Sequence, residues 1–111
     1  MNPEIFQMVI AFRDARQWRP FHTPKNLAIS ISLEANELLE HFQWLSSEEA
    51  VKTRFEGIKE ELADVLIYCI YMADTLGLDL DTIIKEKLQK NEEKYPVDKA
   101  YGKATKYTKW E

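Results

Sequence analysis

The stretch Leu62-Ala63-Asp64-Val65-Leu66-Ile67-Tyr68-Cys69-Ile70-Tyr71-Met72-Ala73 decides the fold of this protein. It is nearly all apolar, is interrupted by one carboxylate and contains neither glycine nor proline, which predicts a helix buried on most sides. A single small bundle does not easily bury a helix all round. We therefore expect a partner subunit to cover this helix in a dimer or a higher homo-oligomer.

Helix start and stop signals on either side of this stretch predict further helices with short connections. The expected helices span residues 3–16, 24–44 and 55–76, and a fourth runs from 79 or 81 to just before Pro96. The expected caps are Asn2, Thr23, Ser46 or Ser47 for a short helical turn at 48–49, and Asp79 or Asp81, with Gly77 as a terminator. The pattern is typical of an all-α, four-helix antiparallel bundle. We expect one domain, residues 1–111, in which residues 97–111 form an extended tail.

Composition excludes several classes of function. The chain has 111 residues, 45% of them hydrophobic, and a net charge of -4, so it carries no basic stripe for a nucleic acid polymer. The acidic balance also disfavours binding to a membrane surface. Cys69 is the single cysteine, which excludes an intramolecular disulfide and fits a reducing compartment. Because the N-terminus lacks signal-peptide features, we expect a cytoplasmic protein.

Four carboxylates form the most informative constellation. Glu34 and Glu37 are three residues apart on one expected helix, and Glu61 and Asp64 are three apart on the next. Residues at that spacing lie on one helix face, so the two pairs face each other if the helices pack side by side. Spacing alone does not choose between Glu61 and Glu60, because Glu60 lies one turn before Asp64.

The electrostatic cost of this constellation indicates a metal site. Two carboxylates about 5 Å apart repel each other by roughly 3 kcal/mol at an effective dielectric near 20. Four ionised carboxylates in one partly buried site would therefore need bound cations or protons. Oxygen ligands suit a hard divalent cation, so we expect Mg²⁺, with Mn²⁺ as a substitute. The competing interpretation is that these acids face solvent on amphipathic helices.

These residues resemble the signature of the MazG-like nucleotide pyrophosphohydrolases. Residues 16–27, 37–44 and 60–68 look like the dCTP pyrophosphatase branch of that family, and the resemblance covers nearly the whole chain. It implies hydrolysis of the bond between the α- and β-phosphates of a nucleoside triphosphate, with dCTP or a modified pyrimidine nucleotide as the expected substrate. It also implies a tetramer built from dimers. The metal ligands that the resemblance implies are Glu34, Glu37, Glu61 and Asp64.

Further roles follow from the resemblance. Glu37 is the first candidate for the group that activates water, and Glu34 and Glu61 remain open alternatives. The candidates for the phosphate chain are Lys87, Asn91, Lys94 and Tyr95. The candidates for the base pocket are Trp18, Phe21, His22, Trp44 and Tyr68. Without a ligand, the tryptophans and Tyr68 would be core or interface residues, and the lysines would favour a helix C-terminus.

Two other classes of protein compete with this hypothesis. A di-iron bundle needs a Glu-x-x-His pair on each of two helices, whereas His41 is the one histidine on an expected helix here. The sequence therefore argues against it. A non-catalytic oligomeric helical module that binds nucleotide or a protein partner is the alternative that we keep. It would bind metal weakly and turn over no nucleotide.

Overall fold

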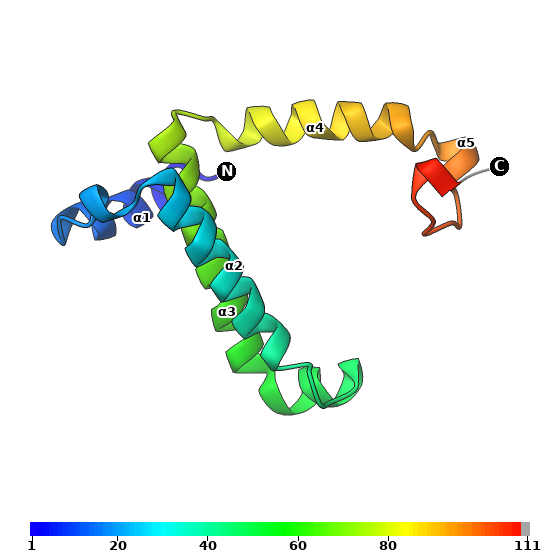
Figure 1. Ribbon diagram of the computed structural model, residues 1–111, viewed down its shortest axis with the longest axis horizontal. Helices are drawn as coiled ribbons and strands as arrows, with labels where there is room; N and C mark the ends of the chain where they lie inside the picture. Colours follow the sequence, from blue (N-terminus) through cyan, green and yellow to red (C-terminus); the bar gives the residue numbers. More distant parts are fainter. Residues whose placement is uncertain (110–111) are drawn as a thin grey trace. The chain divides into compact units, whose positions relative to one another are not determined.

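The structure, a computed structural model, describes residues 1–109 and consists of helices and turns without a strand in that range (Figure 1). Two compact units divide at residue 78, and each is described by itself. The first unit contains α1 (Pro3–Ala15), the 3₁₀ turn η1 (Arg19–Phe21), α2 (Pro24–Glu40) and α3 (Ser47–Leu76). The second contains α4 (Leu80–Lys94), α5 (Val97–Ala100) and η2 (Tyr107–Lys109). The all-α class and its four long helices are confirmed.

Side-chain caps start the long helices at positions that the sequence singled out, although the cap at Ser46 begins the whole of α3 and not only a short turn. The caps of α1 and α2 are Asn2 and Thr23, and between the open alternatives the structure selects Ser46 for α3 and Asp79 for α4. Each side-chain oxygen accepts a backbone N–H of the first turn that would otherwise have no partner in the helix. Gly77 ends α3 in the left-handed region at φ 66°, as expected of a helix terminator.

Two helix boundaries differ from the prediction. Helix α2 ends at Glu40 instead of Trp44, because the N–H of Phe42 bonds to the carbonyl of Leu39 at 2.9 Å and tightens the chain into turns. The expected short turn at 48–49 is part of α3, which begins at Ser47 and continues through a kink at Arg54 (φ −126°, ψ 23°). No glycine or proline stands between the cap and the kink to end the helix.

The predicted tail contains more structure than an extended arm. Helix α5 and the turn η2 lie within it, and the Tyr107 ring packs on the Tyr95 ring at a centroid distance of 5.6 Å. The backbone N–H of Tyr107 also donates to Tyr95 Oη at 3.2 Å. The tail therefore folds back on the end of α4. Residues 110 and 111 of the predicted tail lie outside the described residues.

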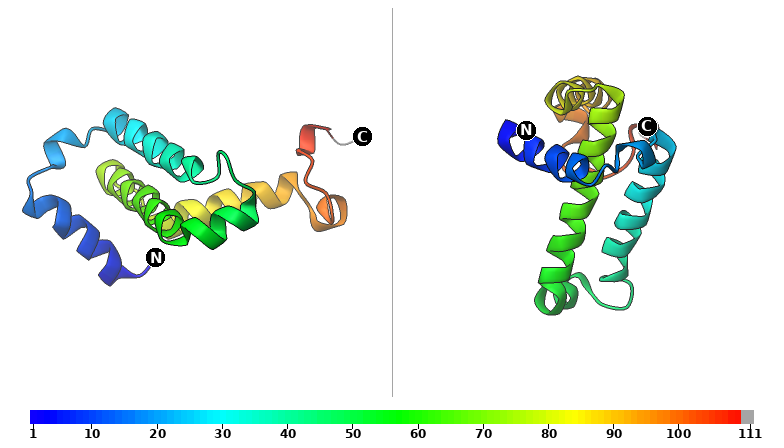
Figure 2. Two further views of the ribbon diagram at one scale, coloured as in Figure 1. Left: turned by 90° about the horizontal axis from the view of Figure 1, so that it is seen from below. Right: turned by 90° about the vertical axis from the view of Figure 1, so that its left-hand side faces the viewer.

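Helices α2 and α3 run in opposite directions side by side, and α1 packs across α3 (Figures 1 and 2). The core of the first unit is small; its buried apolar residues are Leu27, Ala50, Ile70, Tyr71 and Ala73. Leu62 and Leu66, within the apolar stretch that decides the fold, are 49% and 55% exposed. The stretch is thus only partly covered by its own chain. Among residues 1–109, every helix is too short or too polar to span a bilayer.

Candidate active site

Three carboxylates meet between α2 and α3. Glu34 of α2 and Glu61 and Asp64 of α3 each offer one oxygen, and the three oxygens lie within 4.8 Å of one another. The antiparallel packing of the two helices brings Glu34 of one predicted pair to Glu61 and Asp64 of the other, whereas Glu37 is not among the three converging carboxylates. Glu61, and not the exposed Glu60, belongs to this cluster. Glu37 is exposed and lies one helical turn after Glu34.

The cluster strongly perturbs its own protonation. Burial raises the pKa of Glu34 to about 7, and hydrogen bonding to Glu61 and Glu37 and the charges of Glu37 and Asp64 act in the same direction. For Glu61, the hydrogen bond to Glu34 favours ionisation, but burial and the contacts with Glu37 and Asp64 outweigh it, so its pKa is raised as well. The metal-free cluster therefore holds a proton near neutral pH.

The donor set fits a hard cation. One oxygen of Glu34 and one of Glu61, Oε2 in each, are buried and have no hydrogen-bond partner in the structure. A buried carboxylate oxygen without a partner is costly, and a divalent cation with oxygen ligands would satisfy both. Glu34, Glu61 and Asp64 could hold such an ion, and Glu37 lies at the exposed edge of the site.

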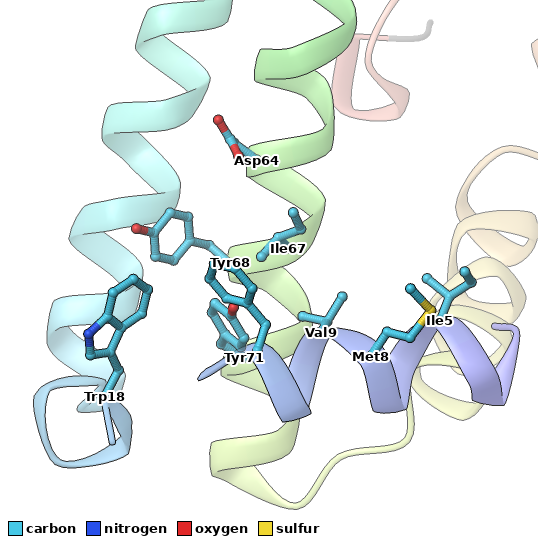
Figure 3. Close-up of a pocket in the computed structure, with 9 residues that line it drawn as sticks. Ile5, Met8, Val9, Trp18, Asp64, Ile67, Tyr68 and Tyr71 are labelled. Carbon is cyan, nitrogen blue, oxygen red and sulfur yellow. The ribbon is translucent and has the colours of Figure 1, made fainter. Parts of the chain in front are cut away.

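A pocket of about 430 Å³ opens beside the carboxylates in the first unit (Figure 3). Its wall from α1 is apolar, and its wall from α3 includes Asp64, Tyr68 and Tyr71. The residues that line it are Ile5, Met8, Val9, Phe12, Trp18, Asp64, Ile67, Tyr68 and Tyr71. Because Asp64 belongs both to this lining and to the carboxylate cluster, a molecule in the pocket lies next to the cluster.

The ring of His22, which does not itself line the pocket, lies among three rings that do. The His22 ring lies 6.3 Å from the Trp18 ring, 6.3 Å from the Tyr68 ring and 5.0 Å from the Tyr71 ring, measured between centroids. Burial raises the pKa of Tyr68, and the charges of Glu34 and Asp64 raise it further, which places this phenol beside the carboxylates. The structure thus brings together Trp18, His22 and Tyr68, three of the predicted base-pocket residues.

Tyr71 and Arg13 were missed by the sequence analysis. Tyr71 is 3% exposed and lines the pocket. It comes seven residues after Asp64, and Tyr68 comes four residues after Asp64, so the three share one helix face. That helical spacing could have identified it. Arg13 is fully buried at the end of α1, where its guanidinium carbon lies 5.8 Å from the Tyr71 ring centroid. Its role depends on contacts between α1 and α3, which no local sequence pattern reveals.

The remaining predicted site residues belong to exposed turns of the first unit or to the second unit. Trp44 is 84% exposed in the turns after α2, and Phe21 is 69% exposed; neither lines the pocket. The predicted phosphate-binding residues belong to the second unit, at the end of α4: Lys87, Asn91, Lys94 and Tyr95. Lys87, Asn91 and Lys94 are spaced by four and three residues, so they share one face of that helix.

An all-helical fold with facing carboxylate pairs beside an aromatic pocket defines the class of this protein. The model of the MazG-like family matches residues 29–109, and the chain belongs to this family. It is 36% identical over 110 residues to dCTP pyrophosphatase 1 of Rattus norvegicus and 33% identical to that of Homo sapiens. Each alignment includes 95% of this chain and 65% of the relative's own length.

Solved structures include a close match in fold. A pyrophosphatase from Archaeoglobus fulgidus superimposes with a TM-score of 0.79 at 46% sequence identity. The match covers 84% of this chain and 90% of the archaeal chain. At this identity the likeness extends beyond the fold to much of the sequence.

Proposed function

We propose that this protein is a magnesium-dependent nucleoside triphosphate pyrophosphohydrolase. It cleaves the bond between the α- and β-phosphates and releases a nucleoside monophosphate and pyrophosphate. The observation that carries the proposal is the position of Asp64, which lies in the carboxylate cluster and also lines the aromatic pocket. A base in the pocket would leave its phosphates beside the metal ligands, where an anhydride bond can be attacked.

The carboxylates have separate tasks in this proposal. Glu34, Glu61 and Asp64 would hold the metal through the oxygens that converge between α2 and α3. Glu37 would be the fourth ligand of the metal or would lie next to the metal site. A bound Mg²⁺ ion, or Mn²⁺ in its place, would offset the charge of the phosphate oxygens. Glu37 orients the attacking water and accepts its proton, because it is exposed and lies beside the cluster without belonging to its closest three oxygens. Glu34 and Glu61 are the alternatives for this role.

The aromatic pocket binds the base. Trp18 and Tyr68 offer faces and edges for stacking, and burial followed by the charge of Arg13 lowers the pKa of His22, which keeps its imidazole neutral. A neutral imidazole can donate or accept one hydrogen bond at a base edge. We propose dCTP or a modified pyrimidine nucleotide as the substrate, in line with the names of the rat and human relatives.

The phosphate chain is assigned to α4. Lys87, Asn91, Lys94 and Tyr95 present cationic and polar groups from one end of that helix, and an ammonium acts on phosphate as a point charge. We propose that residues 1–111 work as a single domain, since the family match spans both compact units.

A homo-oligomer, a dimer or a tetramer, completes the proposal. Large apolar side chains are exposed on both central helices, among them Ile29 and Leu33 of α2 and Leu62 and Leu66 of α3. Each pair is spaced by four residues, so its two members lie on the same face of their own helix. Exposed apolar surface of this extent marks an interaction site. In such an assembly Trp44 would serve the base pocket of a neighbouring subunit.

The test is a panel of common nucleoside triphosphates, incubated with the purified protein and Mg²⁺ and separated by ion exchange. We expect the monophosphate and pyrophosphate, with dCTP or a related pyrimidine nucleotide turned over fastest, and no products after Mg²⁺ is removed with EDTA. Asp64→Asn should lower kcat by about a hundredfold or more, because neutralisation of phosphate charge by a metal is worth several kcal/mol.

Glu60→Gln is the matched control, since it removes an exposed carboxylate one turn from Asp64 and should leave kcat unchanged. A diphosphate and orthophosphate product would show that the wrong bond has been assigned. No turnover of any nucleotide would favour the non-catalytic nucleotide- or protein-binding module instead.

A further inference from the structure

Arg13 is a charged side chain that is fully buried, with an exposed fraction of 0%. Its Nε donates to Asp14 Oδ1 and its Nη1 donates to Asp74 Oδ2, both at 2.9 Å. Asp74 lies near the end of α3, so the second contact joins α1 to α3 across 61 residues of sequence. The guanidinium loses its hydration on burial, which offsets much of its attraction to the two carboxylates, whose side chains stay 50% and 26% exposed. Stability alone is therefore a weak explanation for this pair.

The neighbours of Arg13 are the walls of the pocket. The guanidinium carbon lies 5.8 Å from the centroid of the Tyr71 ring, and Tyr71 lines the pocket. The backbone carbonyl of Arg13 accepts the N–H of Trp18 at 3.3 Å, and Trp18 also lines the pocket. Between them, Gln17 adopts φ 52°, a left-handed conformation that favours glycine. One residue thus contacts a wall on α3 and holds the turn that carries the indole.

His22 connects the same group of side chains. Its ring packs on Tyr71 at a centroid distance of 5.0 Å, and the charge of Arg13 contributes to its lowered pKa after burial. Nη2 of Arg13 and Nδ1 of His22 are both buried without a hydrogen-bond partner in the structure. The contacts of Arg13 therefore lie at the aromatic side of the pocket, with Tyr71 and with the turn that carries Trp18.

We propose that Arg13, held by Asp74, is a positioning residue for the nucleotide base: its guanidinium sets the separation of α1 and α3 and seats Tyr71 on the pocket. This inference rests on the proposed function, because it takes the pocket to be the base site. The Arg13 side chain acts through Tyr71 and the contact between α1 and α3, and it does not touch the reacting phosphates. Its loss should therefore weaken binding of the nucleotide and leave the chemical step intact.

The test is steady-state kinetics with dCTP at saturating Mg²⁺, measured well below the Tm of each variant. We expect Arg13→Met to raise KM about tenfold while kcat stays within about twofold of the wild-type value. Arg13→Lys should give an intermediate KM, since an ammonium keeps the charge but lacks the planar fork that contacts two carboxylates. Arg19→Met is the control. The Arg19 side chain is 64% exposed and its Nη1 lies 4.0 Å from Asp74 Oδ2, at the outer limit of an ion pair, so its removal should not change KM.

The inference is overturned if folded Arg13→Met and Arg13→Lys both keep the wild-type KM, or if kcat falls while KM does not rise. Should Arg13→Met fail to fold, Arg13→Lys and Asp74→Asn decide by the same comparison of KM with kcat. An inactive wild-type protein would refute the proposed function and this inference with it. An active wild-type protein whose variants show no rise in KM would refute this inference alone.

Discussion

Asp64 and Glu60 lie one turn apart on α3 and show how sharply position decides the role of a carboxylate. Asp64 offers an oxygen to the cluster with Glu34 and Glu61, whereas Glu60 is exposed and belongs to no such group among the described residues. Glu61, which does belong to the cluster, is turned away from Glu60 by about 100° around the helix axis. At this scale the chemistry of the site depends on which acids the packing of α2 encloses.

The stability of the folded protein should depend on pH through His22. Burial, followed by the charge of Arg13, lowers its pKa below the value of 6.5 that it has in the unfolded chain. The unfolded state then binds the proton more tightly, so the contribution of His22 to stability is present above about pH 6.5 and is lost as pH falls through the window below it. We expect His22→Phe to keep the ring packing on Tyr71 and to remove this loss.

Thermal unfolding of both proteins from pH 8 to pH 5 checks this prediction. The wild-type Tm should fall relative to that of His22→Phe by on the order of a few degrees as the buffer is acidified, because both proteins share every other titrating group. Melting curves that stay parallel over the whole range would contradict it.

At the scale of elements, the His41 side chain at the end of α2 closely approaches α3 at Gly57. An ideal Cβ placed on Gly57 would lie 2.5 Å from Cε1 of His41, the residue that ends α2. The imidazole therefore occupies the space that any larger residue would need. Glycine in a helix costs about 1 kcal/mol relative to alanine, so its presence in α3 is explained by the close approach of this ring.

Gly57→Ala should destabilise the protein as long as His41 is present. Overpacking of this kind typically costs about 1–3 kcal/mol, which exceeds the gain in helix propensity of about 1 kcal/mol. In a His41→Ala background the clash is absent, and Gly57→Ala should then stabilise the protein. Urea denaturation of the wild type, both single variants and the double variant measures the two effects. The same sign in both backgrounds would show that the ring moves aside freely.

At the scale of the whole molecule, large apolar side chains of α2 and α3 lie at the surface of the single chain: Ile29, Leu33, Leu62 and Leu66. Each of these side chains is between 48% and 58% exposed. Full burial of a leucine contributes about 1.5–3 kcal/mol, so covering the exposed half of four such residues in each chain would favour association. The first unit has few buried residues of its own, which makes association a source of stability as well.

Leu66→Lys should therefore weaken the assembly and lower the mass of the particle in solution. Glu60→Lys places the same side chain on an exposed polar position of the same helix, and it should leave the mass unchanged. Light scattering after size exclusion at micromolar protein measures both variants beside the wild type. A wild-type protein that runs as a single chain, or a Leu66→Lys variant with the wild-type mass, would contradict the prediction.

The sequence by itself determined the helices, their caps and the two carboxylate pairs. Asn2, Thr23 and Gly77 act through hydrogen bonds and backbone conformations within a few residues, and the 3.6-residue period places Glu34 with Glu37 and Glu61 with Asp64. These are local properties of the chain. The sequence patterns predicted the end of α2 four residues too late. Whether the chain continues the helix or forms a tight turn there depends on packing.

Only the tertiary structure decided which residues meet. It selected Glu61 over Glu60, added Tyr71 to the pocket and placed Arg13 between α1 and α3. It also left Trp44 exposed, although the sequence offered it as an equal of Trp18. The physical reason is that helical periodicity defines a face but not its neighbour: the contact between Arg13 and Asp74 spans 61 residues and exists only once α1 has packed across α3.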